Sequence, residues 1–108
     1  MSNNRIRQIV ISTGVVTTLA GPAQGTTTAG DTDGTGNAAR FTGATSITTD
    51  GTNLYVAAGC KIRQIVILTG VVTTLAGPAP GANTCGDTDG TGNAARFNAP
   101  EGITTIPY

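Results

Sequence analysis

The sequence lacks most of the side chains that enzymes use for acid–base and nucleophilic chemistry. It contains no histidine, and Glu101 is its only glutamate. No serine or cysteine lies near a residue suited to act as its base, and no pattern brings two carboxylates together across a site. We therefore expect a protein that is not an enzyme, with no catalytic residues and no organic cofactor.

Charge is scarce as well. Only 11% of the residues are charged, the net charge is zero and the isoelectric point is near 6.0. This balance argues against a nucleic-acid partner and against a polybasic membrane-surface segment. No apolar run approaches the roughly 18 residues of a membrane-spanning helix, and the polar N-terminus lacks the apolar core of a signal peptide.

Helix-forming residues are few. Threonine and glycine dominate, valine and isoleucine supply most of the apolar bulk, and lysine, glutamate and leucine are scarce. This bias favours strands and turns over helices. A weakly charged, threonine-rich composition is also typical of extracellular proteins, so we expect an extracellular or cell-surface location.

What the sequence does contain is an internal repeat. Residues 6–49 return as residues 62–105 at a constant offset of 56 positions without a gap, and 34 of the 44 aligned positions are identical. A repeat unit rarely buries its apolar face alone, and about three units are needed for a stable array. Two copies leave two open ends, so we expect further copies of the chain to cover them.

Each copy predicts short antiparallel strands. Two β-branched runs around a Ser-Thr-Gly turn predict a hairpin over residues 5–20, and an Asp-Gly turn predicts another over residues 46–57. The first hairpin returns over residues 61–76. The expected strands are 5–11, 15–20, 46–49, 53–57, 61–67, 71–76 and 102–105.

A long loop follows each copy of the repeated hairpin, at residues 21–36 and 77–93. The first loop contains no apolar residue larger than alanine, and ordered loops of this length tend to be functional or packed on themselves. The motif NAARF after each loop predicts one helical turn that inserts a phenylalanine between successive units. Phe41 and Phe97 are the expected anchors.

We interpret residues 1–108 as a single repeat domain. Residues 5–49 hold the end of one unit, a long loop and the first strand of the next unit. Residues 46–76 form one complete unit of four antiparallel strands, the layout of a β-propeller blade. Residues 77–105 hold the second long loop and the first strand of a further unit.

The pieces NLYVA, KIRQIV, TGVVTTLAG and DGTGNAARFNAPEGI, in this order, resemble the long-loop NHL-repeat family of β-propellers over nearly the whole chain. The resemblance implies an all-β fold of four-stranded propeller blades. It also implies about six blades per closed domain, whereas this chain holds one complete blade, and its first copy has TGATSI in place of NAPEGI. We therefore expect blades that are incomplete in one chain and are completed by head-to-tail homo-oligomerisation, into a ring of three protomers or a filament.

Both cysteines depart from the repeat in the same copy. Cys60 and Cys85 stand where the first copy has Asn4 and Ala29. In a four-stranded blade the turn before the third strand and the loop after the fourth lie on the same face, so the two thiols are expected to meet. A disulfide there closes a loop of about 25 residues, contributes roughly 3–4 kcal/mol and suits an oxidising compartment. The alternative is two unrelated residues that stay reduced.

Four aspartates lie in the two copies of the motif GDTDGTG, which resembles the start of a calcium loop. They are Asp31, Asp33, Asp87 and Asp89. Calcium needs about six to eight oxygen ligands, and the helix–loop–helix calcium motif adds a bidentate glutamate that is missing here. A calcium site is therefore the weaker alternative, and we expect the carboxylates to cap turns or to pair with Arg40 and Arg96. Arg7 and Arg63 are expected at solvated positions on their strands.

Three hypotheses about function follow. The favoured one is a non-enzymatic structural or scaffold protein that assembles with itself into a ring or a filament. The second is a module that binds a glycan or a protein through the long loops of an assembled top face. A sugar site usually needs an exposed aromatic ring, and the only tyrosines are Tyr55, in a strand, and Tyr108. The third is an excised or designed fragment of a longer propeller.

Overall fold

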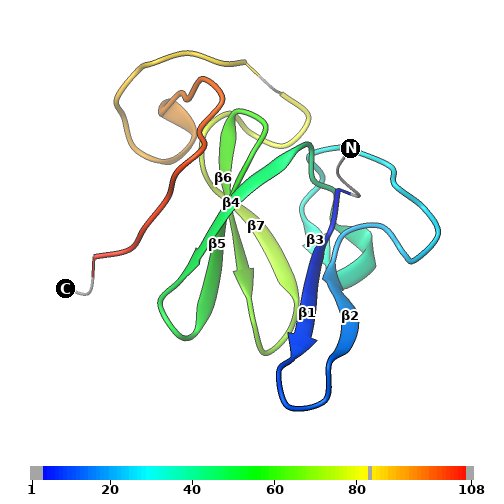
Figure 1. Ribbon diagram of the computed structural model, residues 1–108. Coiled ribbons are helices and arrows are strands. Elements are labelled where there is room, and N and C mark those ends of the chain that lie inside the picture. The colour runs from blue at the N-terminus through cyan, green and yellow to red at the C-terminus, as the bar shows by residue number, and fades with distance from the viewer. Residues whose placement is uncertain (1–3, 83, 107–108) are drawn as a thin grey trace.

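The computed structural model describes residues 4–82 and 84–106, and this part of the chain is all-β (Figure 1). The elements are β1 (Ile6–Val10), β2 (Val15–Ala20), β3 (Gly34–Thr35), η1 (Gly36–Ala38), β4 (Ala44–Thr49), β5 (Asn53–Ala58), β6 (Lys61–Val66), β7 (Val71–Ala76) and η2 (Gly92–Ala94). The two η elements are single turns of 3₁₀ helix. No described segment forms a long apolar helix of the kind that crosses a bilayer.

The strands form two antiparallel sheets. β1 and β2 make a two-stranded sheet, and the second sheet has the order β3-β7-β6-β5-β4. The six longer strands agree with the predicted ones to within two residues at each end, because β-branched runs separated by turn residues specify both the strands and their limits. β4 to β7 therefore form a meander of four sequential antiparallel strands.

The turn between β4 and β5 is closed by Asp50. Its carboxylate accepts hydrogen bonds from the backbone N–H of Asn53 (2.8 Å) and of Thr52 (2.9 Å), and from the Tyr55 hydroxyl (2.8 Å). These bonds hold the pKa of Asp50 below its usual value, the bond from Asn53 contributing most. The Asp-Gly signal in the sequence thus corresponds to an aspartate that satisfies the backbone donors of its own turn.

The two repeats share one hydrophobic core. The first copy contributes Ile6, Ala20, Ala39 and Phe41, the second copy contributes Ile65 and Val72, and Val56 and Ala58 come from β5, between the two copies. Burial of each large aliphatic side chain contributes about 1.5–3 kcal/mol. The core therefore lies between the copies, and neither copy provides both of its walls.

Two features differ from the sequence-based expectation. Residues 102–105 are not in a strand, because a strand needs a hydrogen-bonded neighbour and no described segment takes the place beside them that β5 takes beside β4. Conversely, Gly34 and Thr35, expected within a loop, form β3 and pair with Val72 and Val71 of β7. Both differences concern the contact of one repeat with the next.

Candidate functional site

The contact between the two repeats is centred on Arg63 of β6, which is only 1% exposed. Its guanidinium lies over the ring of Phe41, 5.1 Å from the centroid, and its Nη2 lies 2.9 Å from Asp33 Oδ1. Arg63 also donates to the backbone carbonyls of Arg40 (2.7 Å) and Thr32 (3.0 Å). Arginine suits this place because its planar cation can stack on a ring and bind several oxygens at once.

Asp33 connects this cation to the next strand. Its carboxylate accepts hydrogen bonds from the N–H (3.2 Å) and the hydroxyl (3.0 Å) of Thr74 in β7. One aspartate of the first long loop thus binds two neighbouring strands of the second copy. A buried charge without such partners is costly, so this network favours one arrangement of the two repeats.

A second ion pair lies beside the first. Lys61 is buried, and its Nζ lies 2.6 Å from Asp31 Oδ2 and 2.9 Å from the carbonyl of Ala82. Asp31 also accepts a hydrogen bond from the N–H of Gly81 (3.0 Å). Burial by itself raises the pKa of Asp31, but the hydrogen bonds from Lys61 and Gly81 and the nearby cationic charges outweigh it and hold the pKa below its usual value.

This lowered pKa predicts acid sensitivity. Since the pKa of Asp31 is lower in the folded than in the unfolded chain, its stabilisation is present above the unfolded pKa, about 3.9. It is lost as the pH falls through the folded pKa. We expect the unfolding free energy of Asp31→Asn, measured by urea titration at a series of pH values, to fall less steeply below about pH 4 than that of the parent chain.

The matched control for this titration is Asp87→Asn, at the equivalent position of the second copy. Asp87 makes no ion pair with any residue of the described chain. At a concentration where the chain is monomeric, so that Asp87 meets no second copy, the control should keep the acid dependence of the parent, to which Asp50 also contributes. An unchanged titration in Asp31→Asn would contradict the role of the ion pair.

Backbone pairing completes the contact. The two residues of β3 pair with β7, and the N–H of Gly36 donates to the carbonyl of Gly70 (2.9 Å) in the turn before β7. The first long loop thus adds a short edge strand to the sheet of the second copy. Charge, ring and backbone contacts all join the loop of one repeat to the hairpin of the next.

The second long loop has the same internal structure as the first. Asn93 Nδ2 donates to the Gly77 carbonyl at 3.0 Å, the distance between the equivalent Asn37 and Gly21. The backbone bonds Gly86 N–H to Phe97 carbonyl and Arg96 N–H to Thr88 carbonyl also repeat those of the first loop. The described part of the second loop, which the Cys60–Cys85 disulfide ties to its own hairpin, therefore holds this conformation without a following hairpin in the described chain.

Gly77 allows the second long loop to leave its hairpin in close contact with the neighbouring strand. Its φ is +105°, and a Cβ there would lie 2.7 Å from Cβ of Lys61. Gly21 has the same φ range and the same closeness to Arg5. Only glycine combines this conformation with this approach, so the sequence fixes the path of each loop past the cation at the start of its hairpin, Arg5 or Lys61.

The hairpin of the first copy presents the same side chains without their partners. Arg7, equivalent to the buried Arg63, is exposed. Ile9 is 63% exposed where Ile65 is 0%, and Val16 is 42% exposed where Val72 is 1%. Because these are the same residues in the same strands, the difference reflects what surrounds each hairpin: the second has a preceding long loop and the neighbouring strand β5, and the first has neither among the described residues.

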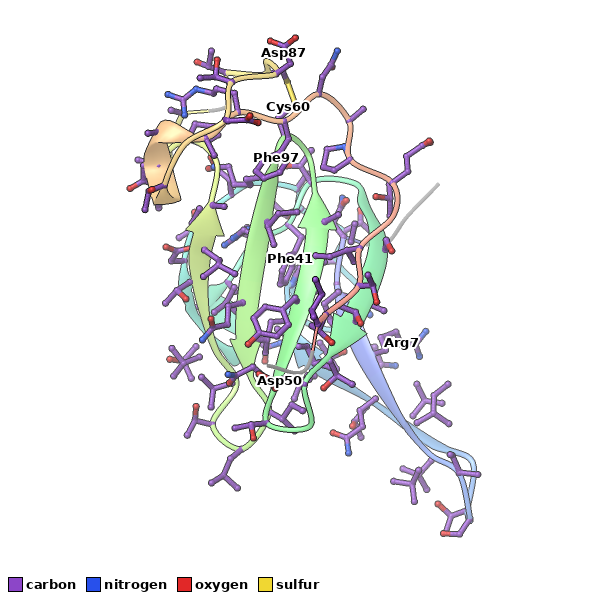
Figure 2. All side chains as sticks on the ribbon, turned by 90° about the vertical axis from the view of Figure 1, so that its left-hand side faces the viewer. Arg7, Phe41, Asp50, Cys60, Asp87 and Phe97 are labelled. Carbon is purple, nitrogen blue, oxygen red and sulfur yellow. A yellow bond between two sulfur atoms is a disulfide. The ribbon has the colours of Figure 1, made fainter. Side chains whose placement is uncertain are left out.

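The second long loop is the complementary half. Thr91 has φ −112° and ψ 129°, against −110° and 128° for Thr35, yet Gly90 and Thr91 are not part of any described ladder. Phe97 is half-buried, whereas Phe41 is fully buried. In Figure 2 the labelled Phe97 and Asp87 lie at one end of the molecule and Arg7 lies on the projecting hairpin, so the two halves are well separated.

The structure joins Cys60 and Cys85, the two cysteines that the sequence pairs. Their Cα atoms lie 5.3 Å apart, within the range of unforced disulfides. The bond ties the turn between β5 and β6 to the second long loop. In the first copy the equivalent Asn4 donates from Nδ2 to the Thr27 carbonyl (2.9 Å), so a hydrogen bond does there what the disulfide does here.

The aspartates have different partners from those expected. Asp31 and Asp33 bind Lys61 and Arg63 of the next repeat. The expected partners, Arg40 and Arg96, instead donate to carbonyls within their own η turns: Arg40 to Asn37 and Ala39, Arg96 to Asn93 and Ala95. Within the described residues, no three acidic, cysteine or histidine side chains gather as they would around a metal ion.

Arg63 corrects the sequence-based expectation most clearly. It was expected to be solvated and is buried, because the long loop of the preceding repeat folds over its strand and neutralises it. Sequence reasoning did not find Lys61 either. The signal was present: both copies carry cations two residues apart on the strand, and acids two residues apart in the loop, GDTDG. Cations and acids at the same spacing indicate that two ion pairs form side by side.

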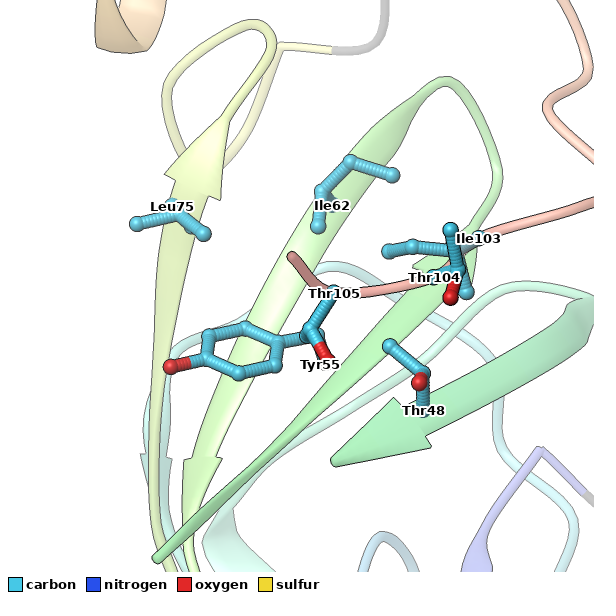
Figure 3. Close-up of a pocket in the computed structure, with 7 residues that line it drawn as sticks. All are labelled: Thr48, Tyr55, Ile62, Leu75, Ile103, Thr104 and Thr105. Carbon is cyan, nitrogen blue, oxygen red and sulfur yellow. The ribbon is translucent and has the colours of Figure 1, made fainter. Parts of the chain in front are cut away.

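A shallow pocket of about 310 Å³ lies on the face of the second sheet (Figure 3). It is lined by Thr48, Tyr55, Ile62, Leu75, Ile103, Thr104 and Thr105. The Tyr55 hydroxyl donates to Asp50 and accepts from Asn53 (3.4 Å). The residues that follow the second loop therefore lie along this sheet, and the ring of Tyr55 is held by its own turn.

Comparison with models of known protein families gives no match, and comparison with curated proteins gives none either.

Proposed function

We propose that this chain is a structural protein that assembles with copies of itself, head to tail, through β-propeller blades. The single observation that carries the proposal is the repeat contact, which occurs once in the described part of the chain, while each of its halves recurs there without a partner among the described residues. A second copy supplies the missing partners. Arg7 of one copy then lies between Asp89 and Phe97 of another, as Arg63 lies between Asp33 and Phe41.

Three further features support this proposal. The meander of β4 to β7 has the strand order of a propeller blade. The second long loop already holds the conformation in which the first loop binds its neighbour, so little ordering opposes the association. Arg5 and Asp87 add a second pair of opposite charge at the same junction, equivalent to Lys61 and Asp31. The disulfide suits the extracellular or cell-surface location that we include in the proposal.

The test is the mass of the chain in solution, measured by light scattering over a range of concentrations. We expect association that Arg7→Glu weakens about 30-fold, the effect of losing a contact worth about 2 kcal/mol. Asp89→Lys should weaken it similarly, because each variant damages a different half of the same contact. A discrete trimer indicates a ring, and a broad distribution of long polymers indicates a filament.

Two controls distinguish this contact from non-specific association. Gln8→Ala changes the neighbour of Arg7 on the opposite face of β1 and should leave association unchanged. Mixing Arg7→Glu with Asp89→Lys should restore association as far as a dimer of the two variants, because the first variant keeps an intact loop and the second keeps an intact hairpin. A chain that stays monomeric at every concentration would overturn the proposal.

A further inference from the structure

The two long loops are held in place by different means. The two aspartates of the first loop pair with the cations of β6, and β3 pairs with β7. In the second loop the equivalent aspartates, Asp87 and Asp89, form no ion pair with a described residue, and residues 90 and 91 join no described ladder. In the described part of the chain, the second loop therefore lacks the neighbour that holds the first.

The disulfide lies in the middle of this second loop. Cys85 precedes Asp87 by two positions, and its bond to Cys60 ties it to the turn between β5 and β6. The next residue, Gly86, donates its N–H to the Phe97 carbonyl (3.0 Å). Figure 2 shows Cys60, Asp87 and Phe97 at the same end of the molecule. The bridge thus restrains the part of the loop that carries an acidic residue and the aromatic residue of the proposed contact.

The first copy has no bridge at the equivalent place. Asn4 and Ala29 stand there, and Asn4 donates a hydrogen bond to the Thr27 carbonyl (2.9 Å). A single hydrogen bond stabilises a loop less than a covalent cross-link does, and the first loop is also bound by the following hairpin. The cross-link therefore occurs in the loop whose acidic residues have no ion-pair partner in the described chain.

We propose that the Cys60–Cys85 disulfide is a redox switch for self-association, an inference that rests on the proposed assembly. In the oxidised chain the bridge holds the second loop in the conformation that binds the hairpin of another copy. In the reduced chain this tie is lost, so association must also order the loop, which costs conformational entropy. The core cluster between the repeats contains no cysteine, and we expect the reduced chain to stay folded at lower stability.

The bridge is accessible to a thiol from the side of Cys85. Cys85 is exposed and Cys60 is only 7% exposed, so a thiolate of a small dithiol attacks the sulfur of Cys85. The attack breaks the S–S bond, forms a mixed disulfide at Cys85 and releases Cys60 as a thiolate, which takes up a proton. The second thiolate of the reductant then displaces the Cys85 sulfur, which is protonated in turn. The dithiol is oxidised to a disulfide, and the protein gains both thiols.

The test compares the oxidised chain with the chain reduced by dithiothreitol, by light scattering over a range of concentrations. Cys60 and Cys85 are the only cysteines of the sequence, so the reductant breaks no other bond. We expect reduction to weaken association about tenfold or more, because a few loop residues must then be ordered on binding. The variant with Cys60→Ser and Cys85→Ser should associate as weakly as the reduced chain, with or without the reductant.

Hydrogen exchange, measured where the chain is monomeric, locates the effect. The N–H groups of Gly86 and Arg96 bond within the second loop, and those of Gly30 and Arg40 make the equivalent bonds in the first. On reduction, exchange at Gly86 and Arg96 should accelerate about tenfold or more relative to Gly30 and Arg40, because only the second loop loses a tie. The amides of β6 that bond to its neighbouring strands should stay protected.

The outcomes separate the switch from the assembly. If the oxidised chain associates and reduction changes nothing, the switch is wrong and the proposed assembly stands. Equal exchange in the two loops after reduction would also refute the switch, as would loss of protection throughout β6, since reduction would then unfold the whole chain. A chain that associates in neither form refutes the assembly and the switch together.

Discussion

Phe41→Ala is expected to lower the free energy of unfolding by about 4 kcal/mol, enough to leave the chain marginally stable or unfolded. The ring is fully buried between the two repeats and lies under the guanidinium of Arg63. Its removal leaves a cavity in the shared core and takes away the aromatic face from a buried cation. Urea unfolding followed by circular dichroism measures the loss.

Phe97→Ala is the matched control, because the same motif surrounds both rings. Phe97 is only half-buried, and no arginine of a following repeat lies on it within the described chain. We expect this variant to cost the monomer less than about 1 kcal/mol and yet to weaken self-association strongly. If the two substitutions destabilise the monomer equally, the difference we assign to the two ends of the chain does not exist.

Loss of the Cys60–Cys85 disulfide is the second large expected effect. The cysteines are 25 residues apart in the sequence, and a loop of this length corresponds to about 3.5 kcal/mol of stabilisation through the unfolded state. The double variant Cys60→Ser and Cys85→Ser should therefore unfold at a clearly lower urea concentration. Adding a reducing agent to the parent chain should reproduce this shift and leave the double variant unchanged.

The first copy offers a control for this experiment. Asn4, which stands in place of Cys60, accepts a hydrogen bond from the Gly43 N–H at 3.2 Å and donates one to the Thr27 carbonyl of the first long loop. A chain with Cys60→Asn and Cys85→Ala reproduces the residues of the first copy. It should regain about 1 kcal/mol over the double serine variant. No difference between them would mean that the asparagine does not replace the bridge.

The longer strands were predictable because their signal is local. Runs such as Val15 to Ala20 combine β-branched residues with clear turn residues at their ends, and neither property depends on distant contacts. The cysteine pair was predictable for a related reason, since both residues break the repeat in one copy. Features whose signal does not depend on distant contacts can therefore be predicted from the sequence alone.

The remaining features depend on contacts between repeats. β3 consists of Gly34 and Thr35, too short a run for a local pattern to predict, and it becomes a strand because β7 lies beside it. Arg63 follows the alternation of a half-exposed strand. Its burial is energetically possible only because Asp33 and Phe41 contact its guanidinium. The expected strand at residues 102–105 is absent for the opposite reason. Its residue pattern suits a strand, but no neighbouring strand lies beside it in the described chain.

Because both halves of the repeat contact occur twice, protein concentration determines when the proposed assembly occurs. Inside the chain the loop and the hairpin are covalently connected, so they meet at an effective concentration in the millimolar range. The same contact between two molecules has no such tether and depends on the actual concentration of protein. In the proposed assembly, equivalent side chains would therefore form a permanent junction within a chain and a dilution-sensitive junction between chains. Crowding on a surface, which raises the local concentration, would convert the second kind of junction toward the first.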